Sequence, residues 1–200
     1  MNRKERMLAG FPYKDWLYKL AEDKMENKLK LYEYNLLCPD EIEEFNKLIK
    51  AILGKTGEKI CIEQPFYCDY GKNIEVGENF FANYDCKIMD RAKVKIGNNV
   101  MFEANVSIYT NGYVINSKFR DSNYKFGNEV VIGDNVWIGG NVVINPGVKI
   151  GNNVIIDSGS VVSMDIPDNV IATGNPCKVL LEITQDEVID YFKSLTIDLN

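Results

Sequence analysis

The sequence predicts a mainly β fold: a parallel β-helix built from six-residue repeats and preceded by an α-helical leader. The first observation is an aliphatic ladder with six-residue spacing, formed by Ile132, Ile138, Ile144, Ile150, Ile156 and Val162. The second is that Gly, Asn or Asp follows most of these ladder residues. The third is a different sequence pattern before residue 58, where apolar residues recur at helical spacing among charged ones.

The six-residue repeat favours short strands joined by tight corners. Six residues are too few for a helix face or a long alternating strand, and Gly, Asn and Asp tolerate the positive φ of tight corners. Stacked coils would place the ladder in a continuous interior, with three strands per coil forming a triangular prism. The same spacing runs through Val76, Ala82 and Ile88, and it resumes two residues out of phase at Ile96, Phe102 and Ile108. We therefore expect the β-helix to span residues 58–182.

The leader, residues 1–57, is expected to contain three helices, within 3–10, 16–37 and 39–54. Pro39 and Asp40 would mark the start of the last helix and Gly54 its end. A further amphipathic helix is expected in the tail, residues 183–200.

One long segment interrupts the repeat at residues 109–130, beginning within the stretch SIYTNGYVINSKF. Long insertions in a repetitive scaffold tend to carry function. This excursion has few apolar residues with which to fold back on its own core, so we expect it to reach towards a neighbouring subunit.

Composition excludes several classes of function. A net charge of −6 argues against nucleic-acid binding. The N-terminus does not read as a signal peptide, and no apolar run approaches the ~18 residues of a membrane span. The five cysteines are dispersed and odd in number, which indicates a cytoplasmic protein without a disulfide framework. With no histidine and no cysteine cluster, no metal site is expected.

The hexapeptides resemble those of left-handed β-helix acyltransferases. MLAGFPY and LYEYN near the start, VVIGDNVWIGGNVVINPGVKIGNN at 130–153 and NPCKV at 175–179 resemble the maltose and galactoside O-acetyltransferase family. The resemblance covers about residues 5–183. It implies left-handed coils, a homotrimer, acetyl-CoA as co-substrate and a small sugar as acceptor.

The resemblance also implies a catalytic histidine within the excursion, in a context like Y-T-x-x-H-P, that takes the proton of the sugar hydroxyl. Here Tyr109-Thr110-Asn111-Gly112 leads to Tyr113 at that position, and the chain has no histidine at all. A free phenol, with a pKa of ~10, is a poor base at neutral pH. A nearby cation such as Arg91 is expected to favour its ionised form. Asp69 and Asp90 are weaker substitutes.

Other residues match positions that bind ligands in the family. By that resemblance, Asn83 would lie beside the reacting thioester, and Asp15, Asp69, Asp90 and Arg91 would face the acceptor, Arg91 standing where the family has an acidic residue. The residues expected to bind acetyl-CoA are Asn83, Trp137, Gly140, Ser158, Ser163, Met164 and Lys178, with Met164 and Leu181 replacing family cations.

Three functions remain open. The first is an acetyl-CoA-dependent sugar O-acetyltransferase that is slow or uses a substitute base. The second is a catalytically inactive trimeric scaffold that binds a sugar or a protein partner, and the third is an acyltransferase with another donor or acceptor. The first is preferred because Asn83, Asp15 and the excursion are retained.

Overall fold

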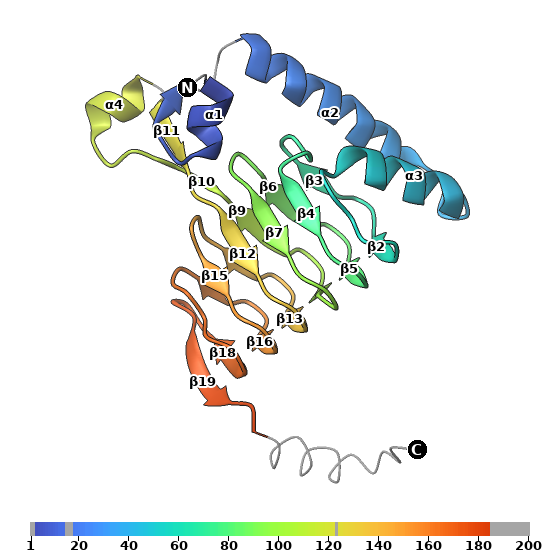
Figure 1. Ribbon diagram of the computed structural model, residues 1–200, viewed down its shortest axis with the longest axis vertical. Helices are drawn as coiled ribbons and strands as arrows, with labels where there is room; N and C mark the ends of the chain where they lie inside the picture. Colours follow the sequence, from blue (N-terminus) through green and yellow to red (C-terminus); the bar gives the residue numbers. More distant parts are fainter. Residues whose placement is uncertain (1–2, 15–17, 123, 185–200) are drawn as a thin grey trace.

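The structure, a computed structural model, describes residues 3–14, 18–122 and 124–184 of the 200-residue chain. It confirms the predicted parallel β-helix, in which short strands stack into three sheets around one core (Figure 1). We name each sheet after its first strand. The β4 face contains β4 (Ile74–Val76), β7 (Val94–Ile96), β12 (Val130–Ile132) and β15 (Lys149–Ile150).

The two other faces complete each coil. The β2 face contains β2 (Ile60–Ile62), β5 (Phe80–Ala82), β8 (Met101–Phe102), β13 (Val136–Ile138), β16 (Val154–Ile156), β18 (Val170–Thr173) and β19 (Lys178–Glu182). The β3 face contains β3 (Tyr67–Cys68), β6 (Lys87–Met89), β9 (Ser107–Tyr109), β14 (Val143–Ile144) and β17 (Val161–Val162). The chain passes from the β4 face to the β2 face, then to the β3 face and on to the next coil.

The aliphatic ladder forms the interior of the prism, as predicted. Every ladder residue from Ile132 to Val162 is at most 2% exposed. The corners carry the predicted left-handed residues, for example Asn135 at φ 57°, Asn141 at φ 59° and Asn153 at φ 54°. Asparagine tolerates this conformation better than most residues, so these corners turn without a glycine, whereas others use Gly147 at φ 89° and Gly159 at φ 75°.

The coils differ in length. Trp137 pairs with Ile155 on the next coil, eighteen residues later, whereas Tyr67 pairs with Lys87, twenty residues later. The two extra residues of each early coil fall after the β3 face. The excursion departs from this same corner one coil later, because it lies between β9 and β12. One edge of the prism therefore carries all three insertions.

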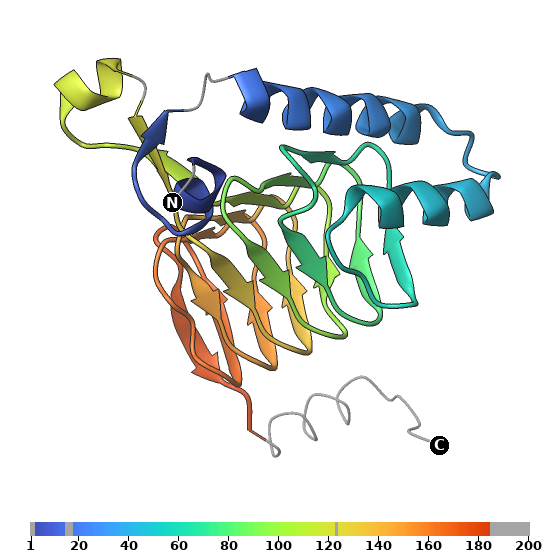
Figure 2. The same cartoon turned by 45° about the horizontal axis from the view of Figure 1, so that its top comes forward.

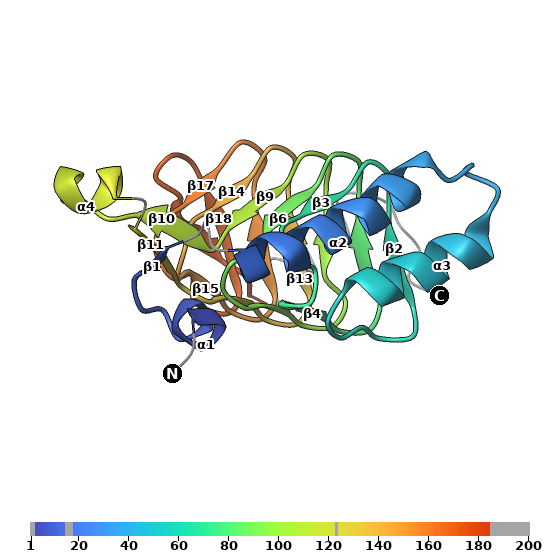
Figure 3. The same ribbon diagram turned by 90° about the horizontal axis from the view of Figure 1, so that it is seen from above.

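The leader forms α1 (Arg3–Leu8), α2 (Tyr18–Leu36) and α3 (Ile42–Ile52). Figures 2 and 3 show α2 lying across the loops of the first coils. Asn35 fixes it there, since its amide donates to the Phe66 carbonyl at 3.0 Å and accepts from the Phe66 N–H at 2.9 Å. The helix expected from Pro39 begins at Ile42 instead, after a turn in which the Cys38 N–H donates to the Glu41 carboxylate at 2.9 Å.

Two features at the ends of the fold were not predicted. A short strand, β1 (Tyr13–Lys14), lies between α1 and α2 and pairs with the excursion. At the other end, β19 turns back antiparallel to β18. The expected helix at 183–200 lies almost entirely outside the described residues. Among the helices that the structure describes, none has the length and apolar character needed to cross a membrane.

Candidate functional site

The candidate site lies along the prism edge that carries the insertions, between the β3 and β4 faces. We call it the insertion edge, and it consists of residues 69–73, 90–93 and 110–129. Each segment follows a strand of the β3 face, and the strand register places Tyr70, Asp90 and Thr110 one above another, with Asp69 beside Asp90. Three of the predicted acceptor residues, Asp69, Asp90 and Arg91, therefore come together here.

Asp69 joins the leader to the insertion edge. Its Oδ2 accepts a hydrogen bond from Arg91 Nε at 2.9 Å, and its Oδ1 lies 2.5 Å from Lys24 Nζ on α2. All three side chains are largely buried. Both carboxylate oxygens of Asp69 are thus committed to cations, an arrangement that favours an anchoring role over proton abstraction.

Asp90 lies beside Asp69 and is completely buried. Its Oδ1 accepts the backbone N–H groups of Asp69 and Tyr70, at 2.9 and 2.8 Å, while its Oδ2 is buried without a hydrogen-bond partner. Burial raises the pKa of Asp90 to about 7; the Tyr70 N–H opposes the shift and the charge of Asp69 adds to it. Within this chain Asp90 shapes the corner on which Asp69 sits and has no surface to offer an acceptor.

The excursion is an ordered hairpin. Strands β10 (Asn111–Tyr113) and β11 (Tyr124–Gly127) pair antiparallel, with the short helix α4 (Ser117–Asp121) between them. It projects from the stack of coils beside α1 (Figures 1 and 2). Strand β1 adds to β11, so the excursion packs against the N-terminal segment of its own chain, a contact not anticipated from its low apolar content.

Thr110 anchors the base of the hairpin to the coil below it. The residue is completely buried. Its Oγ1 donates to the Met89 carbonyl at 2.7 Å and accepts the Ala92 N–H at 2.8 Å. The Asn128 N–H donates to the Thr110 carbonyl at 2.7 Å and closes the excursion. This fixes the direction in which β10 leaves the prism, and with it the position of Tyr113.

Tyr113 stands at the end of β10 with 54% of its surface exposed. Its cross-strand partner in register is Lys125, which is only 9% exposed. The Lys125 ammonium lies 5.1 Å from the centroid of the Tyr113 ring, a cation–π contact. The cation that the structure places beside the phenol is thus Lys125, while Arg91 is bonded to Asp69. Sequence reasoning missed Lys125 because the register of the hairpin was unknown.

Three of the seven residues predicted to bind acetyl-CoA lie on another edge. Asn83, Gly140 and Ser158 follow three strands of the β2 face, so they line the edge between the β2 and β3 faces, which we call the opposite edge. Asn83 Nδ2 donates to Glu103 on the next coil at 3.3 Å, and the Gly140 N–H donates to Ser158 Oγ at 3.1 Å. Trp137 is exposed at the centre of β13, between Met101 and Ile155.

The rest of that predicted set is more dispersed. Ser163 and Met164 are exposed directly after β17, between the β3 and β4 faces of a later coil, and Lys178 is exposed at the start of β19. Asp15 lies outside the described residues. The structure thus gathers two groups of predicted residues on two edges of one prism, with the β3 face between them.

Gly140 has a feature that fits a ligand on the opposite edge. Its φ is not in the left-handed region, and a Cβ at this position would meet only Ala104 O at 3.4 Å and Glu103 Cβ at 3.9 Å, which are ordinary contacts. The described chain itself therefore does not require glycine here, and its lack of a side chain leaves room for a molecule lying along the outside of the prism. Within the described residues no group of three or more His, Cys, Asp or Glu could hold a metal ion.

Comparison with known proteins agrees with this architecture. The maltose acetyltransferase hexapeptide capping motif matches residues 6–57, and the bacterial transferase hexapeptide model matches residues 129–163. The chain is 40% identical to the galactoside O-acetyltransferase of Escherichia coli K12, over 97% of this chain and 96% of that protein.

Two solved structures are similar over nearly their whole length. A maltose O-acetyltransferase from Clostridium difficile 630 is 46% identical, with a TM-score of 0.91 over 92% of this chain and 99% of that one. A galactoside acetyltransferase in complex with coenzyme A is 40% identical, with a TM-score of 0.90 over 94% of each chain.

Proposed function

The chain belongs to the maltose and galactoside O-acetyltransferase family of hexapeptide-repeat proteins, and on that premise we propose that it transfers an acetyl group from acetyl-CoA to a hydroxyl of a small sugar. The observation that carries the proposal is the likeness to a galactoside acetyltransferase solved with coenzyme A, which extends over both edges described above. We also propose a cytoplasmic location, which the five free thiols support.

The reaction requires little covalent chemistry from the protein. The acceptor oxygen forms a bond to the thioester carbonyl carbon, the carbon–sulfur bond breaks, and the hydroxyl proton ends on the departing thiol or in water. Positioning the two substrates supplies roughly 7–11 kcal/mol, and a placed base contributes ~10²–10⁴-fold. The opposite edge would hold acetyl-CoA along Asn83, Gly140 and Ser158, and the insertion edge would hold the sugar.

Tyr113 is the candidate for taking the hydroxyl proton. It stands at the position of the family's histidine and is well exposed, so an acceptor can reach its phenol. The Lys125 ammonium lies 5.1 Å from the centroid of its ring, a cation–π contact that holds the ring in place. We assign Tyr113 the role of a slow base and Lys125 that of positioning its ring.

The separation of the two edges supports an assembly of several subunits. Asn83 and Tyr113 lie on different edges of one prism, so a site that uses both takes one edge from each of two neighbouring chains. The β2 face offers a surface for such contacts, because its outward-facing residues Phe81, Met101, Trp137, Ile155 and Ile171 align in register as an apolar row. We propose the homotrimer that the family resemblance implies, and light scattering that gives the mass of a single chain would refute it.

The proposal is tested by measuring the loss of the acetyl-CoA thioester absorbance with a panel of mono- and disaccharides at pH 7 and pH 9. We expect slow, sugar-dependent turnover that is faster at the higher pH. The second candidate, an inactive sugar-binding scaffold, is favoured by the complete absence of histidine. Sugar binding without any acetyl transfer, under all conditions and also in Tyr113→His, would establish that second function instead.

A further inference from the structure

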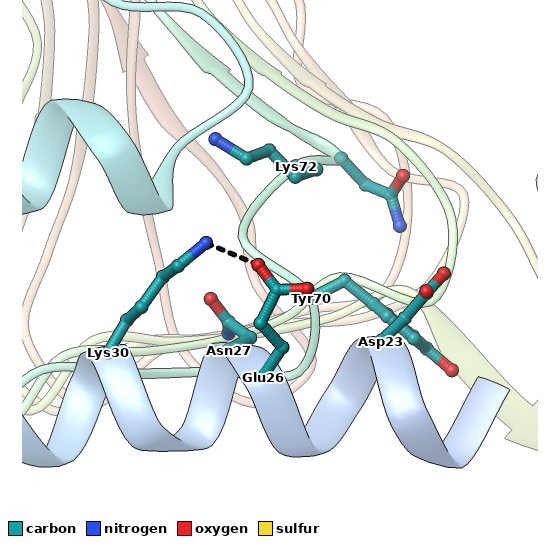
Figure 4. Close-up of a pocket in the computed structure, with 7 residues that line it drawn as sticks. Asp23, Glu26, Asn27, Lys30, Tyr70 and Lys72 are labelled. Carbon is teal, nitrogen blue, oxygen red and sulfur yellow. Dashed lines mark hydrogen bonds and ion pairs between the residues drawn. The ribbon is translucent and has the colours of Figure 1, made fainter. Parts of the chain in front are cut away.

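A polar pocket lies between α2 and the corner loop 69–73 of the insertion edge. Its volume is about 150 Å³. Seven residues line it, all of them polar: Asp23, Glu26, Asn27, Lys30, Tyr70, Lys72 and Asn73. Figure 4 shows the side chains of α2 facing Lys72 and Tyr70 across this space. Neither the proposed acetyl transfer nor the family resemblance gives these residues a role.

Several of the lining groups are held in place by bonds outside the pocket. Asn27 is buried, and its Nδ2 donates to the carbonyls of Cys68 at 3.5 Å and of Asp69 at 3.3 Å. Asn73 is buried too, and its Nδ2 donates to the Asp90 carbonyl at 2.7 Å. Because all three bonds use amide nitrogens, the amide oxygens keep their capacity to accept hydrogen bonds from a ligand. Figure 4 shows the Asn27 oxygen on the cavity side of the helix.

Lys72 is fixed in the same way. Its ammonium donates to the Ala51 and Leu53 carbonyls at the end of α3, at 2.5 and 3.0 Å. On the α2 side, Lys30 pairs with Glu26 at 2.7 Å. The wall therefore presents ammonium donors, carboxylate acceptors and amide acceptors in fixed positions before any ligand arrives, which lowers the entropic cost of binding.

The charges in the pocket select the kind of ligand. Two carboxylates, Asp23 and Glu26, balance two ammonium groups, Lys30 and Lys72, so neither an anion nor a cation is favoured. Apart from the Tyr70 ring and the side-chain stems, no apolar wall is offered to a hydrophobic molecule. A neutral molecule with several hydroxyls fits, because each hydroxyl both donates to carboxylate or amide oxygens and accepts from ammonium groups. At ~30 Å³ per water the volume corresponds to about five water molecules, which is close to the size of one sugar ring.

The pocket adjoins the residues of the acceptor position. Asp23 precedes Lys24 and Tyr70 follows Asp69 in the sequence, and Lys24 and Asp69 form an ion pair at 2.5 Å. Asn27 contacts the backbone of Asp69 directly. A sugar ring in this pocket would therefore lie next to the contact between α2 and the predicted acceptor residue Asp69.

We propose that this pocket is a second sugar subsite, which holds a neutral sugar ring that is not itself acetylated. The proposal rests on the proposed function in one respect, that the acceptor is a sugar. The ring has two sources with the same chemistry: the second ring of an oligosaccharide acceptor, or a separate monosaccharide.

The test uses backbone amide chemical shifts of the full-length protein, titrated with glucose or maltose in the absence of acetyl-CoA. We expect the amides of Asn27, Tyr70, Gly71 and Asn73 to shift. Shifts with glucose alone identify a free sugar ring as the ligand. Shifts only with maltose, accompanied by Tyr113, identify the second ring of an acceptor.

A pair of matched variants shows whether the pocket carries the binding. Glu26→Ala with Lys30→Ala removes the exposed ion pair of the pocket, and Glu44→Ala with Lys47→Ala removes a similar pair on α3 that does not line it. We expect sugar binding to weaken about tenfold in the first double variant and to stay unchanged in the second. No shift with either sugar, or equal affinity in both double variants, overturns the subsite.

Amide shifts report sugar binding separately from acetyl transfer. If the pocket amides shift but no sugar is ever acetylated, the proposed transferase activity is refuted and the second subsite is supported. If maltose is acetylated without any shift at these amides, only the second subsite is refuted.

Discussion

Arg91 Nε donates to Asp69 Oδ2 at 2.9 Å, so Arg91 is bonded to a carboxylate of the preceding coil. By the family resemblance Arg91 would replace an acidic residue, and in this chain Arg91 and Asp69 form one structural unit. Together with Lys24 they join α2, the first coil and the second coil.

Asp69→Ala is expected to destabilise the fold by ~1–3 kcal/mol, because it leaves Lys24 and Arg91 largely buried without their carboxylate. Urea unfolding of the variant and of Glu44→Ala, which removes one exposed partner on α3, provides the comparison. The exposed pair should cost less than ~1 kcal/mol. Equal losses in the two variants would show that the Asp69 cluster has no special structural role.

The buried carboxyl group of Asp90 should make the stability of the fold depend on pH in an unusual way. Its folded-state pKa, raised to about 7 by burial, lies above that of an unfolded aspartate, so the native state binds the extra proton. The resulting stability is fully present below pH ~4 and is lost as pH rises through 7. Asp90→Asn keeps an oxygen for the Asp69 and Tyr70 N–H groups but cannot ionise.

Unfolding free energies from pH 5 to pH 8 test this prediction. The wild-type value should fall relative to that of Asp90→Asn by roughly 3 kcal/mol as Asp90 ionises in its buried site. Parallel curves for the two proteins would mean that Asp90 does not titrate in this range.

The repeat, the ladder and the corner residues were predictable because they obey a local rule of one buried aliphatic residue in every six. The contents of the insertion edge obey no such rule. Lys125 meets Tyr113 only through the register of a hairpin, and β1 joins that hairpin from a segment more than a hundred residues away in the sequence. The burial of Asp90 follows from where the two-residue insertions fall among the coils. The family resemblance named Asn83 and Tyr113 but could not show that they occupy different edges.

Tyr113→His is expected to raise turnover at pH 7 by ~10²–10⁴-fold, because imidazole accepts protons near neutral pH and a placed base contributes that range. Tyr113→Phe keeps the ring over Lys125 and removes the hydroxyl. Initial rates at saturating acetyl-CoA, from pH 6 to pH 10, should increase with pH in the wild type and stay low throughout in Tyr113→Phe. A Tyr113→Phe rate equal to the wild-type rate would make the phenol a bystander.

Lys125→Met tests the cation–π contact separately. The change keeps most of the side-chain volume and removes the ammonium that contacts the Tyr113 ring, so we expect the ring to be held less firmly and the rate at pH 7 to fall. The same change in the Tyr113→Phe background, which has no phenol hydroxyl to position, should not lower the rate further. Identical effects in both backgrounds would assign Lys125 to packing of the hairpin instead.

The Met164→Lys variant tests where acetyl-CoA binds. Met164 is 50% exposed and stands where the resemblance places a lysine, so an ammonium can be introduced without burying charge. A contact between this ammonium and a phosphate of the co-substrate at an exposed site is worth ~1 kcal/mol, which tightens binding roughly fivefold.

Met25→Lys, a change of the same charge at a similarly exposed methionine on α2, is the matched control. Calorimetry at low and high salt should find tighter binding in Met164→Lys only, with the gain shrinking as salt screens it. Equal gains in both variants would reflect only the reduced net negative charge, and no measurable binding in any variant would favour the inactive scaffold over the enzyme.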